Sequence, residues 1–146
     1  MGGYMNTAIT DKWATPPHII HDIIAKYGPI DLDPAADAQN AVAPRFYDIQ
    51  MNGLEQPWNA NLVFLNPPYG RVLLDWTKKA LEEYDSGRSK KIVMLYPSRT
   101  CTRWFHLLYE RTDVTIRFIK GRLKYGDGSS PAPFPSILII IGGVNE

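Results

Sequence analysis

Apolar residues along the chain follow two spacings, which predict where strands and helices lie. Short continuous apolar runs, typical of buried strands, occupy 62–65 and 92–96. Further strands are predicted at 114–119 and 136–141, with briefer strand patterns at 29–33 and 45–48. Apolar residues recur every three or four positions, the spacing of one helix face, within 19–27, 73–84 and 104–108. Strands and helices therefore alternate until the end, where the last two strands follow each other without a helix.

This order predicts an α/β fold in which helices cover both faces of a doubly wound, mostly parallel sheet, closed by a C-terminal antiparallel hairpin. A chain of 146 residues with 45% hydrophobic residues suits one compact domain. We expect that domain to span 13–146, after a polar, flexible segment at 1–12. No apolar stretch approaches the ~20 residues of a membrane helix, and no signal-peptide pattern opens the chain, so we expect a cytoplasmic protein.

Recognisable residues bound the first helix at both ends. Thr15 has the side chain of an N-cap, Pro16 suits the first helical position, and Gly28 suits the end of the helix. A helix N-terminus with a hydroxyl beside it is also a place for a carboxylate. Thr15 is therefore predicted either to cap the helix or to bind the carboxylate of a ligand.

The strand at 62–65 ends in Asn66-Pro67-Pro68-Tyr69, where two prolines stop the strand and fix the backbone direction. The Asn66 side-chain oxygen and the Pro67 carbonyl can then converge as two acceptors, with the Tyr69 ring beside them. Two acceptors that take the hydrogens of a planar amino group leave its lone pair aimed at an electrophilic methyl group. The motif predicts this chemistry, or it is only a rigid turn after a strand.

Two aspartates end the two strands that come first in the chain. Asp33 can bind the ammonium group of a ligand, or it can cap a short helix that opens at Pro34. Asp48 lies fifteen positions after Asp33, where an acid can bind ribose hydroxyls or simply open a turn. No Gly-x-Gly loop follows the first of these strands, so the dinucleotide-binding fingerprint is absent.

Charge is unevenly distributed although the net charge is only +1. Residues 1–70 include three basic and seven acidic residues, whereas 71–146 include thirteen basic and eight acidic ones. This division suits a cationic small molecule in the first half and nucleic acid in the second, or a solvated mixed surface. Cys101 is the only cysteine and the three histidines form no metal-ligand pattern, so neither a disulfide nor a metal is expected.

Four motifs together resemble the phage-type DNA adenine methyltransferase (Dam-like) family, over roughly residues 11–141. They are Trp13-Ala14-Thr15-Pro16, Asp31-Leu32-Asp33-Pro34-Ala35-Ala36-Asp37, Asn66-Pro67-Pro68-Tyr69, and Gly121-Arg122-Leu123 with Pro133-Phe134-Pro135-Ser136. The resemblance implies a Rossmann-like methyltransferase fold and S-adenosylmethionine-dependent methylation of the adenine amino group in double-stranded DNA. The base would be flipped into an Asn-Pro-Pro-Tyr pocket. The protein would act in the cytoplasm of a bacterial or phage-infected host cell.

The resemblance also implies roles for the residues of the Asn-Pro-Pro-Tyr motif. Asn66 and Pro67 would accept the hydrogens of the adenine amino group, Pro68 would fix the turn, and Tyr69 would stack on the flipped base. These four residues are the expected catalytic set.

A second set of roles concerns the cofactor. The resemblance implies that Asp33, in its Asp-Pro motif with Pro34, binds the methionine ammonium group, that Thr15 binds the carboxylate, and that Trp13 packs near the cofactor. Asp48 as a ribose ligand is an inference from its spacing. Asp-Pro-Ala-Ala replaces the glycine-bearing loop usual in methyltransferases, and the short stretch before the next strand leaves the cofactor's adenine pocket unassigned.

DNA contacts are expected from basic and aromatic residues near strand ends and in the predicted hairpin loop. These are Arg71, Arg99, Arg103, Arg122, Lys124 and Tyr125. Contacts to phosphates would give affinity, and contacts to base edges would give sequence choice. Each of these side chains can instead be a solvated surface residue. With no separate recognition domain, sequence specificity must come from these loops, from a dimer partner, or be low. We expect a monomer or a weak homodimer.

Two other functions fit the same residues. The motif can serve another planar amine or amide, namely adenine in RNA, the amino group of cytosine, or a glutamine side chain in a protein. The chain can also be a catalytically silent nucleic-acid-binding domain, a hypothesis supported by the missing glycine loop. Cofactor binding separates the silent domain from the enzymes, and a panel of substrates separates the enzymes from one another.

Overall fold

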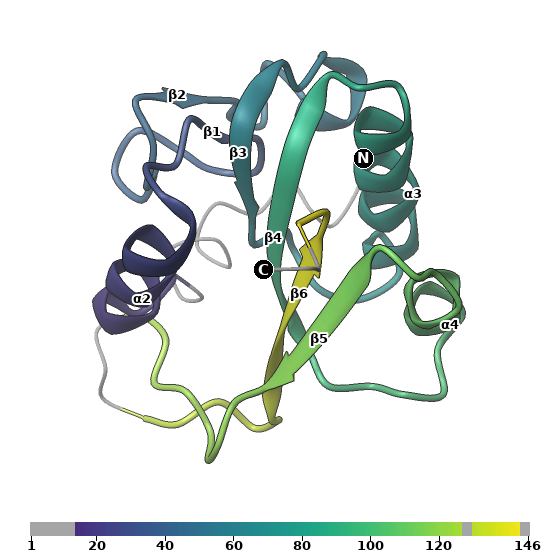
Figure 1. Ribbon diagram of the computed structural model, residues 1–146. Helices are drawn as coiled ribbons and strands as arrows, with labels where there is room; N and C mark the ends of the chain where they lie inside the picture. The colour runs from purple at the N-terminus through teal and green to yellow at the C-terminus, as the bar shows by residue number, and fades with distance from the viewer. Residues whose placement is uncertain (1–13, 127–129, 144–146) are drawn as a thin grey trace.

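The computed structural model describes residues 14–126 and 130–143, which form a mixed α/β fold around one sheet (Figure 1). The sheet has six strands in the order β2-β1-β3-β4-β6-β5. The strands are β1 (Leu32–Asp33), β2 (Arg45–Phe46), β3 (Ala60–Leu65), β4 (Ser89–Pro97), β5 (Val114–Phe118) and β6 (Ser136–Ile141). The helices are α2 (Pro17–Tyr27), α3 (Leu73–Asp85) and α4 (Arg103–Tyr109), with a short 3-10 turn, η2 (Gly53–Glu55).

The strand directions confirm the predicted doubly wound sheet with an antiparallel end. Strands β2, β1, β3 and β4 run parallel to their neighbours. Strand β6 is inserted antiparallel between β4 and β5, so that Leu95 pairs with Leu138 on one side and Arg117 pairs with Leu138 on the other. Because two antiparallel pairings restore the original direction, β5 runs the same way as β4.

Helices cover both faces of the sheet, as Figure 1 shows, and alternate residues of the strands face the two layers. On β3, Leu62 and Phe64 belong to the buried cluster that includes Ile19 and Ile23 of α2. Val63 and Leu65 belong to the opposite cluster. That cluster contains residues of α3 and α4, among them Leu73, Trp76, Trp104 and Leu108. The apolar runs that form β3, β4 and β6 are therefore strands buried on both sides. Strand β5 lies at the edge of the sheet, and its Arg117 and Phe118 are exposed.

A buried carboxylate joins α3 to the strands beside it. Glu83 is 1% exposed and accepts hydrogen bonds from the Trp58 backbone, 2.7 Å away, and from Lys79 and Arg88. Burial raises the pKa of this carboxyl, but the hydrogen bonds from Arg88, Trp58 and Lys79 outweigh burial and lower it to about 2. Glu83 is therefore ionised at neutral pH and fixes α3 to the segment that enters β3.

Two sequence predictions about helix starts are wrong. Pro16, not Thr15, is the N-cap of α2, and no side chain caps this helix. The backbone of Pro16 is extended (φ −60°, ψ 138°), so Pro16 takes the half-in position itself and its carbonyl accepts the first helical bond from Ile19. In the described residues, no helix opens at Pro34, because the chain turns there and then pairs as β2. Thr102 caps α4 as its sequence position indicates.

Among residues 14–126 and 130–143, no helix is long and apolar enough to cross a membrane. The segment predicted to be flexible, 1–12, lies outside the residues that the structure describes.

Candidate active site

The strand order reverses between β1 and β3, and the candidate site lies at this reversal. From β1 the chain moves outward to β2, then crosses back to β3 on the other side of β1 and continues to β4. In open α/β sheets the carboxyl ends of the two strands at such a reversal form the usual ligand site. Asp33 is the last residue of β1 and Asn66 directly follows β3.

The other predicted site residues lie at the same edge of the sheet. Arg71 follows β3, and Arg99 and Arg103 follow β4. Because β5 runs parallel to β4, its carboxyl end is also at this edge, and the connection from β5 to β6 carries Arg122 and Lys124 there. Trp13 lies outside the described residues.

Asn66 is held by side chains from two separate parts of the chain. Its Nδ2 donates a hydrogen bond to Oγ1 of Thr15, 2.9 Å away, and its Oδ1 lies 3.0 Å from the hydroxyl of Tyr69. Pro67 is buried, and Pro68 and Tyr69 are half-buried. The Asn66 amide is therefore fixed at the carboxyl end of β3, with the prolines forming the rigid turn that the sequence predicts.

Tyr69 is anchored at its hydroxyl and supported at its ring. The hydroxyl lies 2.9 Å from the carbonyl oxygen of Leu95 in β4. The ring meets Phe134 edge-on, with 5.6 Å between centroids, and Phe134 also lies 5.8 Å from the guanidinium of Arg99. Burial, reinforced by the neighbouring Tyr125, raises the pKa of Tyr69 well above its ordinary value, so the side chain stays a neutral phenol. Leu95 and Phe134 were not among the predicted site residues, although Phe134 lies in one of the four motifs of the family resemblance.

Asp33 is a buried carboxylate without a cationic partner. Its side chain is 4% exposed, and its Oδ2 accepts a hydrogen bond from the Val42 backbone at 3.2 Å. Burial raises its pKa to about 7, although hydrogen bonds from the Val42 and Ala35 backbones oppose the rise. Within the described part of the chain, no lysine or arginine forms an ion pair with Asp33. Because an unpaired buried charge is unfavourable, this carboxylate suits a cationic ligand group.

Gly53 supports the loop that follows Asp33. A Cβ atom at Gly53 would lie 2.0 Å from the carbonyl oxygen of Pro34, so no larger residue fits without moving the loop. The Gly53 carbonyl accepts a hydrogen bond from Nε1 of Trp58, at 2.8 Å, which fixes η2 in place. The sequence shows Gly53 only as a loop residue; its contact with Pro34 joins positions that no sequence pattern relates.

Asp48 follows β2 at the same sheet edge as Asp33. Its Oδ1 accepts a hydrogen bond from the Met51 backbone at 2.9 Å, which is the turn-forming geometry of an aspartate. The side chain is half-buried. Its assignment to a ribose stays a prediction.

The predicted DNA-binding residues fall into two groups. The side chains of Arg71, Arg99, Arg103, Arg122 and Lys124 are exposed. Tyr125 is 4% exposed, and its hydroxyl lies 2.8 Å from Oγ of Ser136. Since Tyr125 packs inside the protein beside Phe134, the structure presents the five cations to solvent but not the tyrosine.

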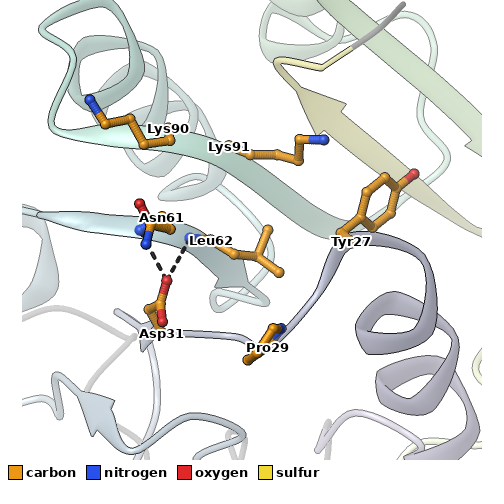
Figure 2. Close-up of a pocket in the computed structure, with 7 residues that line it drawn as sticks. All are labelled: Tyr27, Pro29, Asp31, Asn61, Leu62, Lys90 and Lys91. Carbon is orange, nitrogen blue, oxygen red and sulfur yellow. Dashed lines mark hydrogen bonds between the residues drawn. The ribbon is translucent and has the colours of Figure 1, made fainter. Parts of the chain in front are cut away.

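A hollow of about 290 Å³ lies at the opposite edge of the sheet, at the start of β3 and β4 (Figure 2). Asp31 lies beside it and accepts hydrogen bonds from the Asn61 and Leu62 backbones, at 3.0 and 2.9 Å. Lys90 and Lys91 extend from β4 above it, and Lys91 lies 5.0 Å from the Tyr27 ring. None of the predicted site residues lines this hollow.

The described ranges contain no cluster of side chains suited to binding a metal ion. Across 14–126 and 130–143, no three histidine, cysteine, aspartate or glutamate side chains gather as metal ligands would.

The sequence of the chain matches a family profile and two known proteins. The profile of the DNA N-6-adenine-methyltransferase (Dam) family matches residues 3–137. The DNA N-6-adenine-methyltransferase of Escherichia phage T1 is 39% identical over 67% of this chain, which spans 40% of that enzyme's length. The candidate methyltransferase YfdM of Escherichia coli K12 is 34% identical over 42% of this chain and 74% of its own length.

Solved structures with the same fold are methyltransferases. A candidate RNA methyltransferase of Pyrococcus horikoshii superposes with a TM-score of 0.59 at 13% identity, covering 100% of this chain and 92% of that one. The 23S rRNA methyltransferase ErmE gives a TM-score of 0.53 at 10% identity, over 90% of this chain and 70% of its own. At such identities the likeness concerns the fold, and it confirms the Rossmann-like methyltransferase architecture.

Proposed function

The chain belongs to the DNA N-6-adenine-methyltransferase (Dam) family, and on that premise we propose that it methylates the exocyclic amino group of adenine in double-stranded DNA. The methyl donor is S-adenosylmethionine, which supplies a methyl group on a positively charged sulfur. The observation that carries the proposal is that two functional groups lie at the point where the strand order reverses, between β1 and β3. Asp33, a buried carboxylate that forms no ion pair with any described residue, ends β1, and a fixed amide, Asn66, directly follows the neighbouring β3.

The catalytic role of Asn66 and Pro67 is to position the amino group of the base. Asn66 Oδ1 and the Pro67 carbonyl each accept one hydrogen of this group, so the nitrogen lone pair is directed away from both acceptors and toward the methyl donor. Neither residue needs to ionise or form a bond to the substrate. Pro68 keeps the Pro67 carbonyl in place because a residue before proline is restricted to extended backbone.

Tyr69 receives the flipped base on its ring. The ring is half-buried, its hydroxyl is held at Leu95 and it packs against Phe134 in an edge-to-face arrangement, so its orientation is fixed before the base arrives. A preorganised aromatic face offsets part of the free energy needed to unstack a base from the duplex. The exposed arginines and Lys124 around this edge bind phosphates of the flanking strand.

Asp33 binds the ammonium group of the cofactor's methionine portion. A cation placed beside this carboxylate replaces the water lost on burial, which fits its pKa of about 7 in the free protein. Pro34 shapes the adjoining loop and Asp48 binds the ribose hydroxyls; the role predicted for Trp13 concerns a residue outside the described ranges. Thr15 is the predicted carboxylate ligand, but its hydroxyl already contacts Asn66 in the structure.

The test is transfer of labelled methyl from S-adenosylmethionine to a panel of substrates. Unmethylated duplex DNA, RNA and a glutamine-containing peptide are incubated in parallel, and nucleic acids are digested to nucleosides and separated. We expect label in N6-methyldeoxyadenosine from duplex DNA. Label confined to RNA, to cytosine or to the peptide would assign the site to a different planar group. Cofactor binding without transfer to any substrate would contradict the proposal.

A further inference from the structure

Thr15 approaches the catalytic motif from a distant part of the sequence. It precedes α2, which covers one face of the sheet, yet its Oγ1 lies 2.9 Å from Nδ2 of Asn66 at the end of β3. The side chain makes no capping bond to α2. Its hydroxyl is therefore directed at the amide on which the proposed chemistry depends.

The backbone around Thr15 is constrained on both sides. Pro16 restricts Thr15 to extended conformations, and Pro17 begins α2 immediately afterwards. On the other side, the Ala14 carbonyl accepts a hydrogen bond from the Gly126 backbone at 3.0 Å. A hydroxyl held in this way has a fixed position relative to the sheet, so it can define the position of a flexible partner.

The Asn66 amide needs such a definition because its two ends have opposite chemistry. The oxygen accepts the hydrogens of an amino group, whereas the NH2 end would repel them, and the two ends exchange by a rotation of the amide. Tyr69 lies at the oxygen end of the amide, where its hydroxyl is 3.0 Å from Asn66 Oδ1 and 2.9 Å from Leu95 O, and Thr15 lies at the NH2 end.

We propose that Thr15 is a positioning residue: it holds the NH2 end of the Asn66 amide, whose Nδ2 donates to Thr15 Oγ1, so that the oxygen end is directed at the substrate amine. The inference rests on the proposed function and adds a residue to it. It differs from the role that sequence resemblance gives Thr15, since a carboxylate ligand acts on cofactor affinity and a positioning residue acts on the rate of transfer.

The test compares Thr15→Val, which has the same shape without the hydroxyl, with Thr15→Ser, which keeps it. Single-turnover transfer to duplex DNA at saturating cofactor should slow about tenfold in Thr15→Val, as expected for one lost orienting hydrogen bond. Thr15→Ser should restore the rate to within about threefold of wild type. Calorimetry should give the same cofactor Kd for all three proteins, and thermal unfolding should confirm that each is folded.

A double-mutant cycle with Asn66 isolates the coupling. In an Asn66→Ala background, adding Thr15→Val should change the residual rate by less than about twofold, because no amide remains to be positioned. Three outcomes would overturn the inference: wild-type rate in Thr15→Val, a weaker cofactor Kd with an unchanged rate, or a full additional loss in the double variant. An inactive wild-type protein would instead count against the proposed function, so the two failures are distinguishable.

Discussion

At the scale of single residues, Asp33 shows how a functional group can oppose folding. Its carboxylate is buried without a cation, so the ionised form is disfavoured in the free protein. A neutral residue of the same shape would remove that penalty. A neutral substitution at Asp33 is therefore expected to raise the free energy of unfolding and to weaken ligand binding. A purely structural aspartate would not give this combination.

The first prediction is that Asp33→Asn stabilises the free protein and weakens its binding of the cofactor. The asparagine Oδ1 can still accept the Val42 hydrogen bond, so the loop is retained. At pH 8 we expect the free energy of unfolding to rise by about 1–3 kcal/mol and the cofactor Kd to increase at least about tenfold. Chemical denaturation and calorimetry measure the two effects. A variant that is destabilised, with an unchanged Kd, would remove Asp33 from the cofactor site.

The second prediction concerns pH. The folded-state pKa of Asp33 is about 7, above its ordinary 3.8. The free energy of unfolding should therefore decrease as pH rises from 3.8 to about 7, and Asp33 should not change it below 3.8. Binding of an ammonium group requires the ionised form. Cofactor affinity should therefore fall about tenfold per pH unit below about 7 and level off above it. Calorimetry from pH 5.5 to 8.5 checks this, and Asp33→Asn should lack the slope.

At the scale of elements, η2 determines where the loop after β1 lies. Gly53 contacts Pro34 so closely that a single added carbon would occupy the position of the Pro34 carbonyl. Asp33, the proposed cofactor ligand, immediately precedes that proline. The element is three residues long, yet it connects the segment before β3 to the candidate site.

The third prediction is that Gly53→Ala displaces the Asp33-Pro34 loop. We expect a loss of about 1–3 kcal/mol in stability, typical of overpacking, together with weaker cofactor binding. Gly87→Ala is the control, because Gly87 has nothing within 4 Å of its Cβ position and lies between α3 and β4 at a positive φ of 87°. That variant should lose stability through backbone strain while its cofactor Kd stays the same. Equal Kd values for both variants would contradict the account of η2.

Sequence patterns predicted the elements of this fold well because the central strands β3, β4 and β6 are apolar on both faces and each helix on one. The absence of a helix between the last two predicted strands also indicated the antiparallel end of the sheet. The patterns failed at Thr15, where a hydroxyl before proline can serve either a helix or a distant amide. They also failed to distinguish Tyr125, which is buried against Phe134, from its exposed neighbours. Both failures concern contacts between segments that are far apart in the chain.

At the scale of the whole molecule, acidic and basic side chains lie at different parts of the carboxyl edge of the sheet. Asp33 and Asp48 follow β1 and β2, whereas the exposed arginines follow β3, β4 and β5. The proposed catalytic motif, Asn66-Pro67-Pro68-Tyr69, follows β3, between the acidic and the basic groups. A cationic cofactor and a polyanionic substrate would thus approach from opposite sides of Asn66.

The fourth prediction is that removing two of these cations weakens DNA binding electrostatically. The double variant Arg122→Ala/Lys124→Ala should bind duplex DNA more weakly, and the slope of log K against log salt should decrease by about 2, as expected for two lost phosphate contacts. Lys90→Ala is the control, since Lys90 lies beside the hollow at the opposite edge (Figure 2). Fluorescence anisotropy at several salt concentrations measures both. An unchanged slope in the double variant would place the DNA elsewhere.

The central claim is that Asn66 directs the adenine amino group toward the methyl donor. The most direct measurement is the single-turnover rate of methyl transfer to duplex DNA by wild-type protein and Asn66→Ala, with cofactor binding measured on the same samples. The account predicts a rate at least about a hundredfold lower in the variant, with a nearly unchanged cofactor Kd, because the lost acceptor acts mainly in the transition state. Transfer by Asn66→Ala at the wild-type rate would contradict it.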